Sequence, residues 1–522
     1  MNKKILCWNI CFIIVIILSM FVILFCTAFD VLTDHDLVFS YGRTFLHPEH
    51  GRYLATFTNN ILTERLPEIF NIHPNDFQII VINPIKAVLI IISCLYIANA
   101  AFLFKNENIL KPQTYNSAYI FTYILIFLLL FNHNFFFNSD RKYYSIFENT
   151  VFFEYPMSIF LYVVVLGICL YLFIKREKLN KANYIILLIA SLLLGTSVDS
   201  VTLSVFAAWG IMALYFIILI IKAFIKKENL QNIKQNCLYI IPVYLSYATG
   251  LYLYYLHPPV EHEPNYGDYT FHEYIVNNIV PYIKTYINVF LGRNSTILIP
   301  IIIILIIGLF LCKKEDIKKL SLFVSVNILG FFIFFAAIFV IGYNSDGYWI
   351  VFDKWINIYR VITLFYLLAV IGFVCDKGKF EKYSDRIKII ICIIILAIFH
   401  KNLINDYWTN IENTRIKTKE LRTVAYKAEK IATTVNTEDI IVPPEFEYYK
   451  DILWFDQIGF ENCDYTIYIN NVHPKIKKKS VVYSENALDN ITFTEEELKE
   501  LKFQNLLQEK MYRHKKHIVG CY

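Results

Sequence analysis

Long apolar runs recur along the chain and are separated by polar connections, most of them short. The first run follows Asn2-Lys3-Lys4 and lacks a small-residue cleavage site, which predicts a retained helix rather than a removed signal. About eleven runs are long enough to cross ~30 Å of hydrocarbon, although the fifth and the last are short enough for tilted or re-entrant segments. They lie near 5–28, 79–104, 114–133, 151–174, 183–198, 201–225, 237–256, 296–312, 320–342, 356–375 and 387–400.

Lysine divides the connections into two groups. With the N-terminus inside, KNENILKPQ, KREKLNK, KAFIKKENLQNIKQN, KKEDIKK and DKGKFEKYSDRIK all fall on one side of the membrane. These connections and the N-terminus hold about 21 Lys and Arg, against about 8 in the opposite loops, a bias that marks the cytoplasmic face. The twelve His all fall on the other face, at its boundary or in the tail. We expect any chemistry on the outer face, although short Lys-filled inner connections alone would also give this pattern.

The outer face has three large pieces in this topology. A transmembrane domain, 1–400, carries outer loops 29–78 and 257–294, and residues 401–522 form a C-terminal extracytoplasmic domain. In that domain IENTRIKTKELRTVAYKAEKIA has a helical pattern, whereas DIIVPPE, DYTIYIN and KSVVYS are typical of strands. The predicted fold class is therefore mainly α: a polytopic membrane protein with about eleven transmembrane helices and a small α+β outer domain.

Composition agrees with a membrane protein. Hydrophobic residues make up 57% of the 522, aromatic residues 17%, and the mean hydropathy is +0.46. The formal charge of +5 says little, because in a membrane protein the division of Lys and Arg between the two faces is what matters. We expect the lipid bilayer as a partner, and no nucleic acid. The chain is rich in Ile, Lys and Asn, which is typical of low-GC bacteria and predicts a multi-pass protein of a bacterial inner or cell membrane.

The first outer loop contains the densest candidate chemistry, in DHDLVFSYGRTFLHPEHGRY from position 34 to position 53. A group-transfer enzyme at a membrane surface needs a base for a hydroxyl proton and cations for a phosphate leaving group. Asp34 and Asp36 suit the first role, and Arg43 and Arg52 suit the second because a guanidinium binds two phosphate oxygens at once. Taken alone, the spacing also fits Asp and Arg that pair in a solvated loop.

The arrangement along the whole chain resembles the multi-spanning GT-C glycosyltransferases, and within them bacterial O-antigen glucosyl-transferase-like proteins and their uncharacterised relatives. The similar features are Asp34-His35-Asp36, then Gly51-Arg52-Tyr53 before the second helix, and WINIYRVITLF with Arg360 near the tenth. FENTVFFEYPMSIFLYVVV and LLLGTSVDS are similar to further family segments. Two features depart from the family: His35 interrupts the acidic pair, and Glu is more usual than Asp199.

The resemblance implies an inverting transfer from a sugar on a polyprenyl phosphate to a surface glycan or glycolipid, with a first-loop acid as base. By position, Asp36 is the expected base and Asp34 the alternative. The resemblance and the residue types together give candidate phosphate or donor residues and candidate cavity residues, although the Arg and Tyr also fit an interfacial belt. The first set is Arg52, Arg43, Arg360 and Lys86, and the second is Asp199, Glu154, Tyr155 and His35.

Charged side chains within the spans constrain two of these assignments. Lys86 and Asp199 would be costly against lipid, so each is expected to point into the bundle or a wet cavity. Outside the spans, HPPVEHEPNYGDY offers possible ligands for a divalent cation such as Mg²⁺ or Mn²⁺: His257, Glu261, His262, Glu263 and Asp268. This run has no fixed ligand spacing, so a solvated loop is the simpler interpretation and no metal residue is assigned.

The main alternative function is a transporter or flippase of lipid-linked glycans, which also needs cations for phosphate. Such a protein should carry broken helices and charges near the bilayer midplane, whereas the ionisable residues here gather at helix ends and in loops. A protein that only displays the outer domain would not need about eleven spans.

Overall fold

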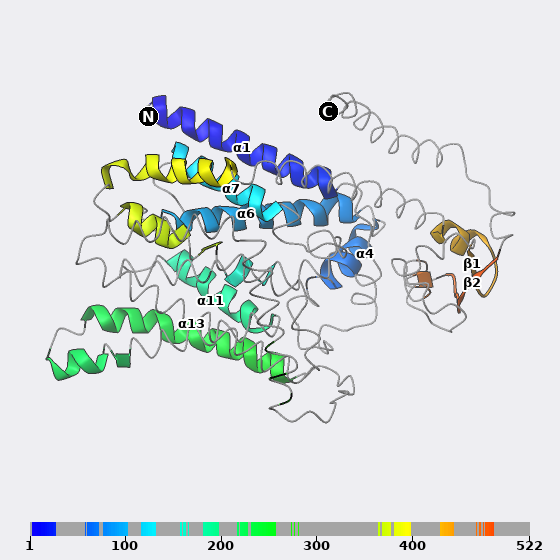
Figure 1. Cartoon of the computed structure of the whole chain (residues 1–522). Coiled ribbons are helices and arrows are strands. Elements are labelled where there is room, and N and C mark those ends of the chain that lie inside the picture. Colours follow the sequence, from blue (N-terminus) through cyan, green and yellow to red (C-terminus); the bar gives the residue numbers. More distant parts are fainter. Residues whose placement is uncertain are drawn as a thin grey trace. The chain divides into compact units, whose positions relative to one another are not determined.

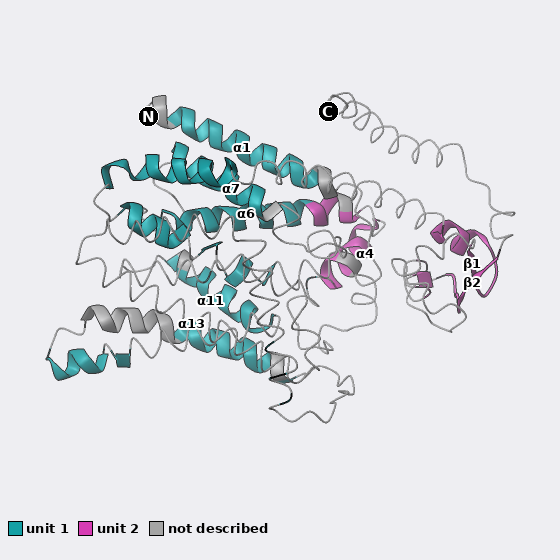
Figure 2. Cartoon of the chain, in the orientation of Figure 1, with its two compact units in different colours: residues 1–25, 44–58, 84–410 teal, residues 26–43, 59–83, 411–522 magenta. Residues whose placement is uncertain are grey.

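The computed structural model shows a mainly helical chain with a small C-terminal sheet (Figure 1). It divides into two compact units: residues 1–25, 44–58 and 84–410 form unit 1, and residues 26–43, 59–83 and 411–522 form unit 2 (Figure 2). The residues that the structure describes are 3–27, 58, 60–72, 77–102, 116–131, 157–158, 160–162, 165, 181–197, 217–218, 220–227, 231–256, 273, 276, 280, 364–365, 368–376, 381–397, 428–442, 466, 469–470, 473 and 475–484.

The longer described helices overlap predicted apolar runs. The longer ones are α1 (Lys3–Thr27), α6 (Asn83–Ala100), α7 (Ser117–Phe131), α11 (Lys181–Gly195) and α13 (Gln231–Leu256). A π-helical turn, η2 (Gln78–Ile82), leads directly into α6. The described residues of 157–165, 217–225, 364–376 and 384–397 are helical too, whereas the predicted spans at 296–312 and 320–342 lie outside the described residues.

Two helices in the described part, Leu6–Leu24 and Ile80–Ala100, are long and apolar enough to cross a membrane. Ser117–Leu129 and Tyr184–Gly195 are apolar but shorter. Large apolar side chains of α1 are exposed in the chain by itself, as expected for a lipid-facing surface. They are Leu6, Ile10, Ile13, Ile14, Ile17, Leu18 and Phe21. The total of eleven spans stays a prediction.

Aromatic rings pack α1 and α6 against α7. The ring of Phe12 on α1 lies edge-on to Tyr119 and Tyr123 of α7, with centroids 5.5 and 5.8 Å apart. The Tyr119 hydroxyl donates to the Leu95 carbonyl of α6 at 3.4 Å, and its ring lies 5.4 Å from that of Phe102. A buried tyrosine here supplies apolar area and satisfies its hydroxyl at a backbone oxygen.

Two helices from late in the sequence, 368–376 and 384–397, pack against α6 and α7. A Cβ added at Gly372 would lie 2.5 Å from the Ala101 carbonyl oxygen, so only glycine permits this approach to the end of α6. On the following helix, the Cys392 sulfur lies 3.6 Å from the Thr122 hydroxyl of α7. Residues more than 250 positions apart are thus packed together in unit 1.

The pair α11 and α13 shows another close approach through small residues. A Cβ at Gly195 would lie 2.5 Å from the Tyr247 carbonyl oxygen, and one at Gly250 would overlap the Leu192 carbonyl. One turn away, the Ser246 hydroxyl donates to the Leu188 carbonyl at 2.8 Å. Small residues four apart that bring two backbones together are typical of helix pairs in membranes.

In unit 2, the segment before α6 folds back on itself. A π-helical turn, η1 (Asn60–Arg65), continues into α4 (Leu66–Phe70). Asn71 ends α4 in the left-handed conformation, with φ 51°, which Asn tolerates better than most side chains. The Phe70 and Phe77 rings stack with centroids 6.2 Å apart, which ties α4 to the start of the next helix.

The C-terminal part of unit 2 contains a two-stranded parallel sheet. β1 (Ile440–Val442) pairs with β2 (Val481–Tyr483), with Ile440 opposite Val481. Both strands lie within predicted ones, and the helix at 428–434 falls on the end of the predicted helical pattern. The third predicted strand, DYTIYIN, is wrong at its described positions, because Thr466, Ile469 and Asn470 are helical. Parallel strands need a long crossover connection, which is usually helical, and a local alternating pattern does not reveal that need.

Candidate functional site

Most of the predicted site falls outside the described residues. This applies to both possible bases, to three of the four phosphate candidates and to all four cavity candidates, so their roles stay predictions. They are Asp34, Asp36, Arg43, Arg52, Arg360, His35, Glu154, Tyr155 and Asp199.

Lys86 is the site candidate that the structure does describe. It lies in the first turn of α6 and is fully buried, with 0% of its surface exposed. The exposed residues Val88 and Ile92 occupy another side of the helix. The expectation that Lys86 points into the protein rather than toward lipid is confirmed.

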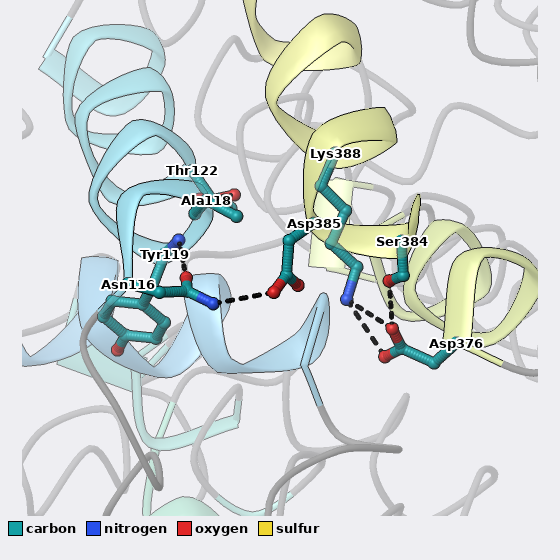
Figure 3. A network of polar contacts seen from close by, with 8 residues as sticks. All are labelled: Asn116, Ala118, Tyr119, Thr122, Asp376, Ser384, Asp385 and Lys388. Carbon is teal, nitrogen blue, oxygen red and sulfur yellow. Dashed lines mark hydrogen bonds and ion pairs between the residues drawn. The ribbon is translucent and has the colours of Figure 1, made fainter. Parts of the chain in front are cut away.

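A second buried lysine, Lys388, forms an ion pair with Asp376 (Figure 3). Its Nζ donates to both carboxylate oxygens of Asp376, at 2.8 and 3.0 Å, and each side chain is 2% exposed. The Ser384 hydroxyl also donates to Asp376. On another side, the Phe102 ring centroid lies 4.1 Å from the Lys388 ammonium, where the negative face of the ring stabilises the cation. These contacts together replace the water that both charges lose.

A second set of polar contacts, made by Asn116, lies beside this pair (Figure 3). Asn116 precedes α7, and its side-chain oxygen accepts the Tyr119 backbone N–H at 2.9 Å, as an N-cap should. Its amide nitrogen donates to Asp385 at 3.0 Å. Asn116 therefore caps one helix and binds the start of another.

These contacts bring together the borders of two connections at the same end of the bundle. Phe102 and Asn116 border the connection between α6 and α7, and Lys388 and Asp385 follow the connection between the helices 368–376 and 384–397. Both were predicted to be cytoplasmic from their lysines, and their common end is what that sidedness requires. The carboxylate of Asp376 is occupied by protein donors, which indicates a structural role.

Sequence reasoning missed this cluster because DKGKFEKYSDRIK has the composition of a solvated basic loop. It contains five cations, and nothing local marks Lys388 as the buried one. An acid at the end of an apolar helix was the one available signal, since Asp376 opposes the helix dipole and needs a cation.

A third buried lysine, Lys478, organises the described part of the C-terminal domain. Its Nζ donates to the Val435 and Thr437 carbonyls, at 2.7 and 2.6 Å, just beyond the helix 428–434. The Asn470 side chain makes two hydrogen bonds to the Lys478 backbone. Its amide oxygen accepts the Lys478 N–H at 2.7 Å, and its amide nitrogen donates to the Lys478 carbonyl at 2.8 Å. Burial lowers the pKa of Lys478, and the carboxylate of Asp439 opposes that shift.

The described residues contain no group of three His, Cys, Asp or Glu side chains that could hold a metal ion. His473 and Glu429 form a pair, with 2.8 Å between ring nitrogen and carboxylate oxygen, and this pair joins the helix 428–434 to the segment before β2. The possible ligands of the second outer loop lie outside the described residues: His257, Glu261, His262, Glu263 and Asp268.

Comparisons with known proteins add no family to this description. No protein-family model, no curated protein and no solved structure matches the chain.

Proposed function

We propose that the protein is an integral-membrane glycosyltransferase that moves a sugar from a polyprenyl phosphate to a surface glycan or glycolipid on the extracytoplasmic face. The observation that carries the proposal is that the two ends of α6 adjoin different kinds of segment. The Asp- and Arg-rich first loop precedes its N-terminal end. About 27 Å further on, given 1.5 Å per residue, its other end meets the cluster that joins the two Lys-rich connections.

The buried position of Lys86 also supports the proposal. It lies in the turn of α6 nearest the first loop, where its ammonium could stabilise a lipid phosphate in a site from which water is excluded. Residues 59–78 of the first outer loop belong to the same compact unit as residues 411–522. That grouping is what a topology with both segments on one side of the membrane requires.

The proposed reaction is a single inverting displacement. The acceptor hydroxyl oxygen attacks the anomeric carbon of the donor while Asp36 takes the hydroxyl proton. The bond from the anomeric carbon to the phosphate oxygen breaks, and polyprenyl phosphate leaves with its electron pair. Arg52, with Arg43, Arg360 or Lys86, stabilises the negative charge that grows on the phosphate.

The experiment compares the mass of surface glycans in the native host for the wild type, a deletion strain and single-residue variants. Asp36→Asn and Asp34→Asn remove each possible base, and Asp30→Asn is the matched control from the same loop. All variants must reach equal membrane levels. We expect deletion and Asp36→Asn to lose one sugar mass, because general-base catalysis contributes about 10²- to 10⁴-fold. Asp30→Asn should keep it.

The other outcomes separate the alternatives. Loss in Asp34→Asn but not in Asp36→Asn would move the base to Asp34. A deletion that removes the sugar while both Asn variants retain it would contradict the first-loop base and favour transport of a lipid-linked glycan.

A further inference from the structure

The π-helical turn η2 places an unusual buried side chain just before α6. Gln78 is 0% exposed, and neither its amide nitrogen nor its amide oxygen has a hydrogen-bond partner among the described residues. A buried amide without hydrogen-bond partners destabilises the folded state, because it has lost its contacts with water. Such a side chain therefore needs a hydrogen-bonding partner from outside the described chain.

The backbone geometry also sets this position apart. The N–H of Asn83 donates to the Gln78 carbonyl, which closes the wide turn that defines a π-helix. π-helical turns are rare and are frequently found at functional sites. Gln78 begins this turn and Asn83 ends it, and both side chains are buried. Both belong to unit 2.

The chemistry of a carboxamide narrows the class of ligand. The Gln78 amide offers two donors and one acceptor and carries no charge. A phosphate could use only its donors, a metal ion only its oxygen, and a lipid chain neither. Sugar hydroxyls both donate and accept, so neighbouring hydroxyls on one ring can satisfy both ends of the amide. A buried water molecule is the competing occupant.

We infer that Gln78 is a specificity residue that hydrogen-bonds hydroxyl groups of the transferred sugar, an inference that rests on the proposed transferase function. Burial strengthens such contacts, since a site built to bind a hydroxyl is left with unpaired polar groups when the hydroxyl is missing. Gln78 acts on recognition of the donor sugar, and the proton transfer stays with the first-loop acid.

The test uses the purified full-length protein in lipid nanodiscs and titrates defined lipids. The probes are polyprenyl phosphate without sugar and the same lipid carrying a hexose, an N-acetylhexosamine or a pentose. Binding is followed as the shift in thermal unfolding, reported by reaction of the buried thiols Cys94, Cys375 and Cys392 with a fluorogenic reagent. Gln78→Met preserves the shape of the side chain without its polar atoms, and Ile80→Met changes an exposed residue on the same turn as the matched control.

We expect one sugar-bearing lipid to bind the wild type more tightly than sugar-free polyprenyl phosphate. Gln78→Met should weaken that sugar-bearing lipid about tenfold, the effect of one or two lost hydrogen bonds, and leave the sugar-free lipid within about twofold. Ile80→Met should behave as wild type. Gln78→Asn, which keeps the carboxamide but withdraws it by one methylene, should fall in between and serves if Gln78→Met does not fold.

Two results would overturn the inference in distinguishable ways. If the wild type binds every sugar-bearing lipid no better than the sugar-free one, the proposed donor and the role of Gln78 both fail. If the wild type prefers one sugar and Gln78→Met keeps the full preference, the donor stands and Gln78 holds only a structural water.

Discussion

Of the buried lysines, Lys388 in unit 1 and Lys478 in unit 2 are stabilised by different partners. In unit 1 the ammonium of Lys388 lies against both oxygens of Asp376 and over the Phe102 ring. In unit 2 the ammonium of Lys478 donates to two backbone carbonyls beyond a helix end. The Lys388 pair cancels charge, whereas Lys478 relies on the partial negative charge of helix-terminal carbonyls.

The difference reflects the surroundings of each residue. Lys388 lies on an apolar helix, where a single charge is costly and a counter-charge restores neutrality. Lys478 lies in the predicted extracytoplasmic domain, where backbone dipoles and the carboxylate of Asp439 offset its burial only in part, so its pKa is lowered. The two sites should therefore differ in how much they lose when the ammonium is removed and in how they respond to pH.

The largest effect is expected from Lys388→Met. It leaves the carboxylate of Asp376 buried without its cation, which costs about 3–5 kcal/mol of folding free energy. Thermal unfolding of the purified protein, followed by reaction of the buried Cys375 and Cys392 thiols, measures the loss. The double variant Asp376→Leu with Lys388→Met should recover most of it, because no charge is then left behind. Lys382→Met, at an exposed position of the same connection, is the control.

Equal destabilisation by Lys388→Met and Lys382→Met would contradict the ion pair. If Lys388→Met instead costs no more than Lys478→Met, the contrast between the two units fails.

A smaller effect is expected from Asn116→Ala, which removes the side-chain contacts of Asn116 beside the ion pair. It should destabilise unit 1 by about 1 kcal/mol, the usual cost of a lost N-cap. Asn116→Ser keeps a capping oxygen but is too short to reach Asp385 as Asn does. The same thiol-reaction assay should show that Ser recovers most of the loss if the cap dominates, and little if the bond to Asp385 dominates.

Local patterns were enough to predict most of the described elements. Runs of apolar residues placed the helices, because a segment without polar side chains has few other stable arrangements in lipid. The predicted strands around Ile440–Val442 and Val481–Tyr483 are confirmed, whereas the helical crossover residues Thr466, Ile469 and Asn470 follow from the parallel pairing and were missed. Local patterns do not report pairing between distant segments.

The buried polar groups were predicted less well for the same reason. Lys86 was expected to be buried because it interrupts an apolar run, and it is buried. Lys388 and Lys478 lie among other lysines, in DKGKFEKYSDRIK and KIKKKS, where each resembles its solvated neighbours. Only the approach of Asp376 to one, and of Val435 and Thr437 to the other, distinguishes them.

The smallest effect is the pH dependence of the C-terminal domain. Burial lowers the pKa of Lys478 below the usual 10.5 of a lysine, so the folded domain releases this proton before the unfolded chain does. Between the lowered pKa and 10.5 the unfolded chain binds more protons, and folding stability therefore rises with pH in that window. Below the window both states are protonated and the contribution is constant.

Pulse proteolysis of the full chain in urea, with detection of a C-terminal tag from about pH 8 to pH 11, measures this slope. Lys478→Met should flatten it, and Lys479→Met, which removes an exposed lysine paired with Glu438, should not. A slope that survives Lys478→Met would assign the titration to another group and leave backbone carbonyls as full compensation for the buried ammonium.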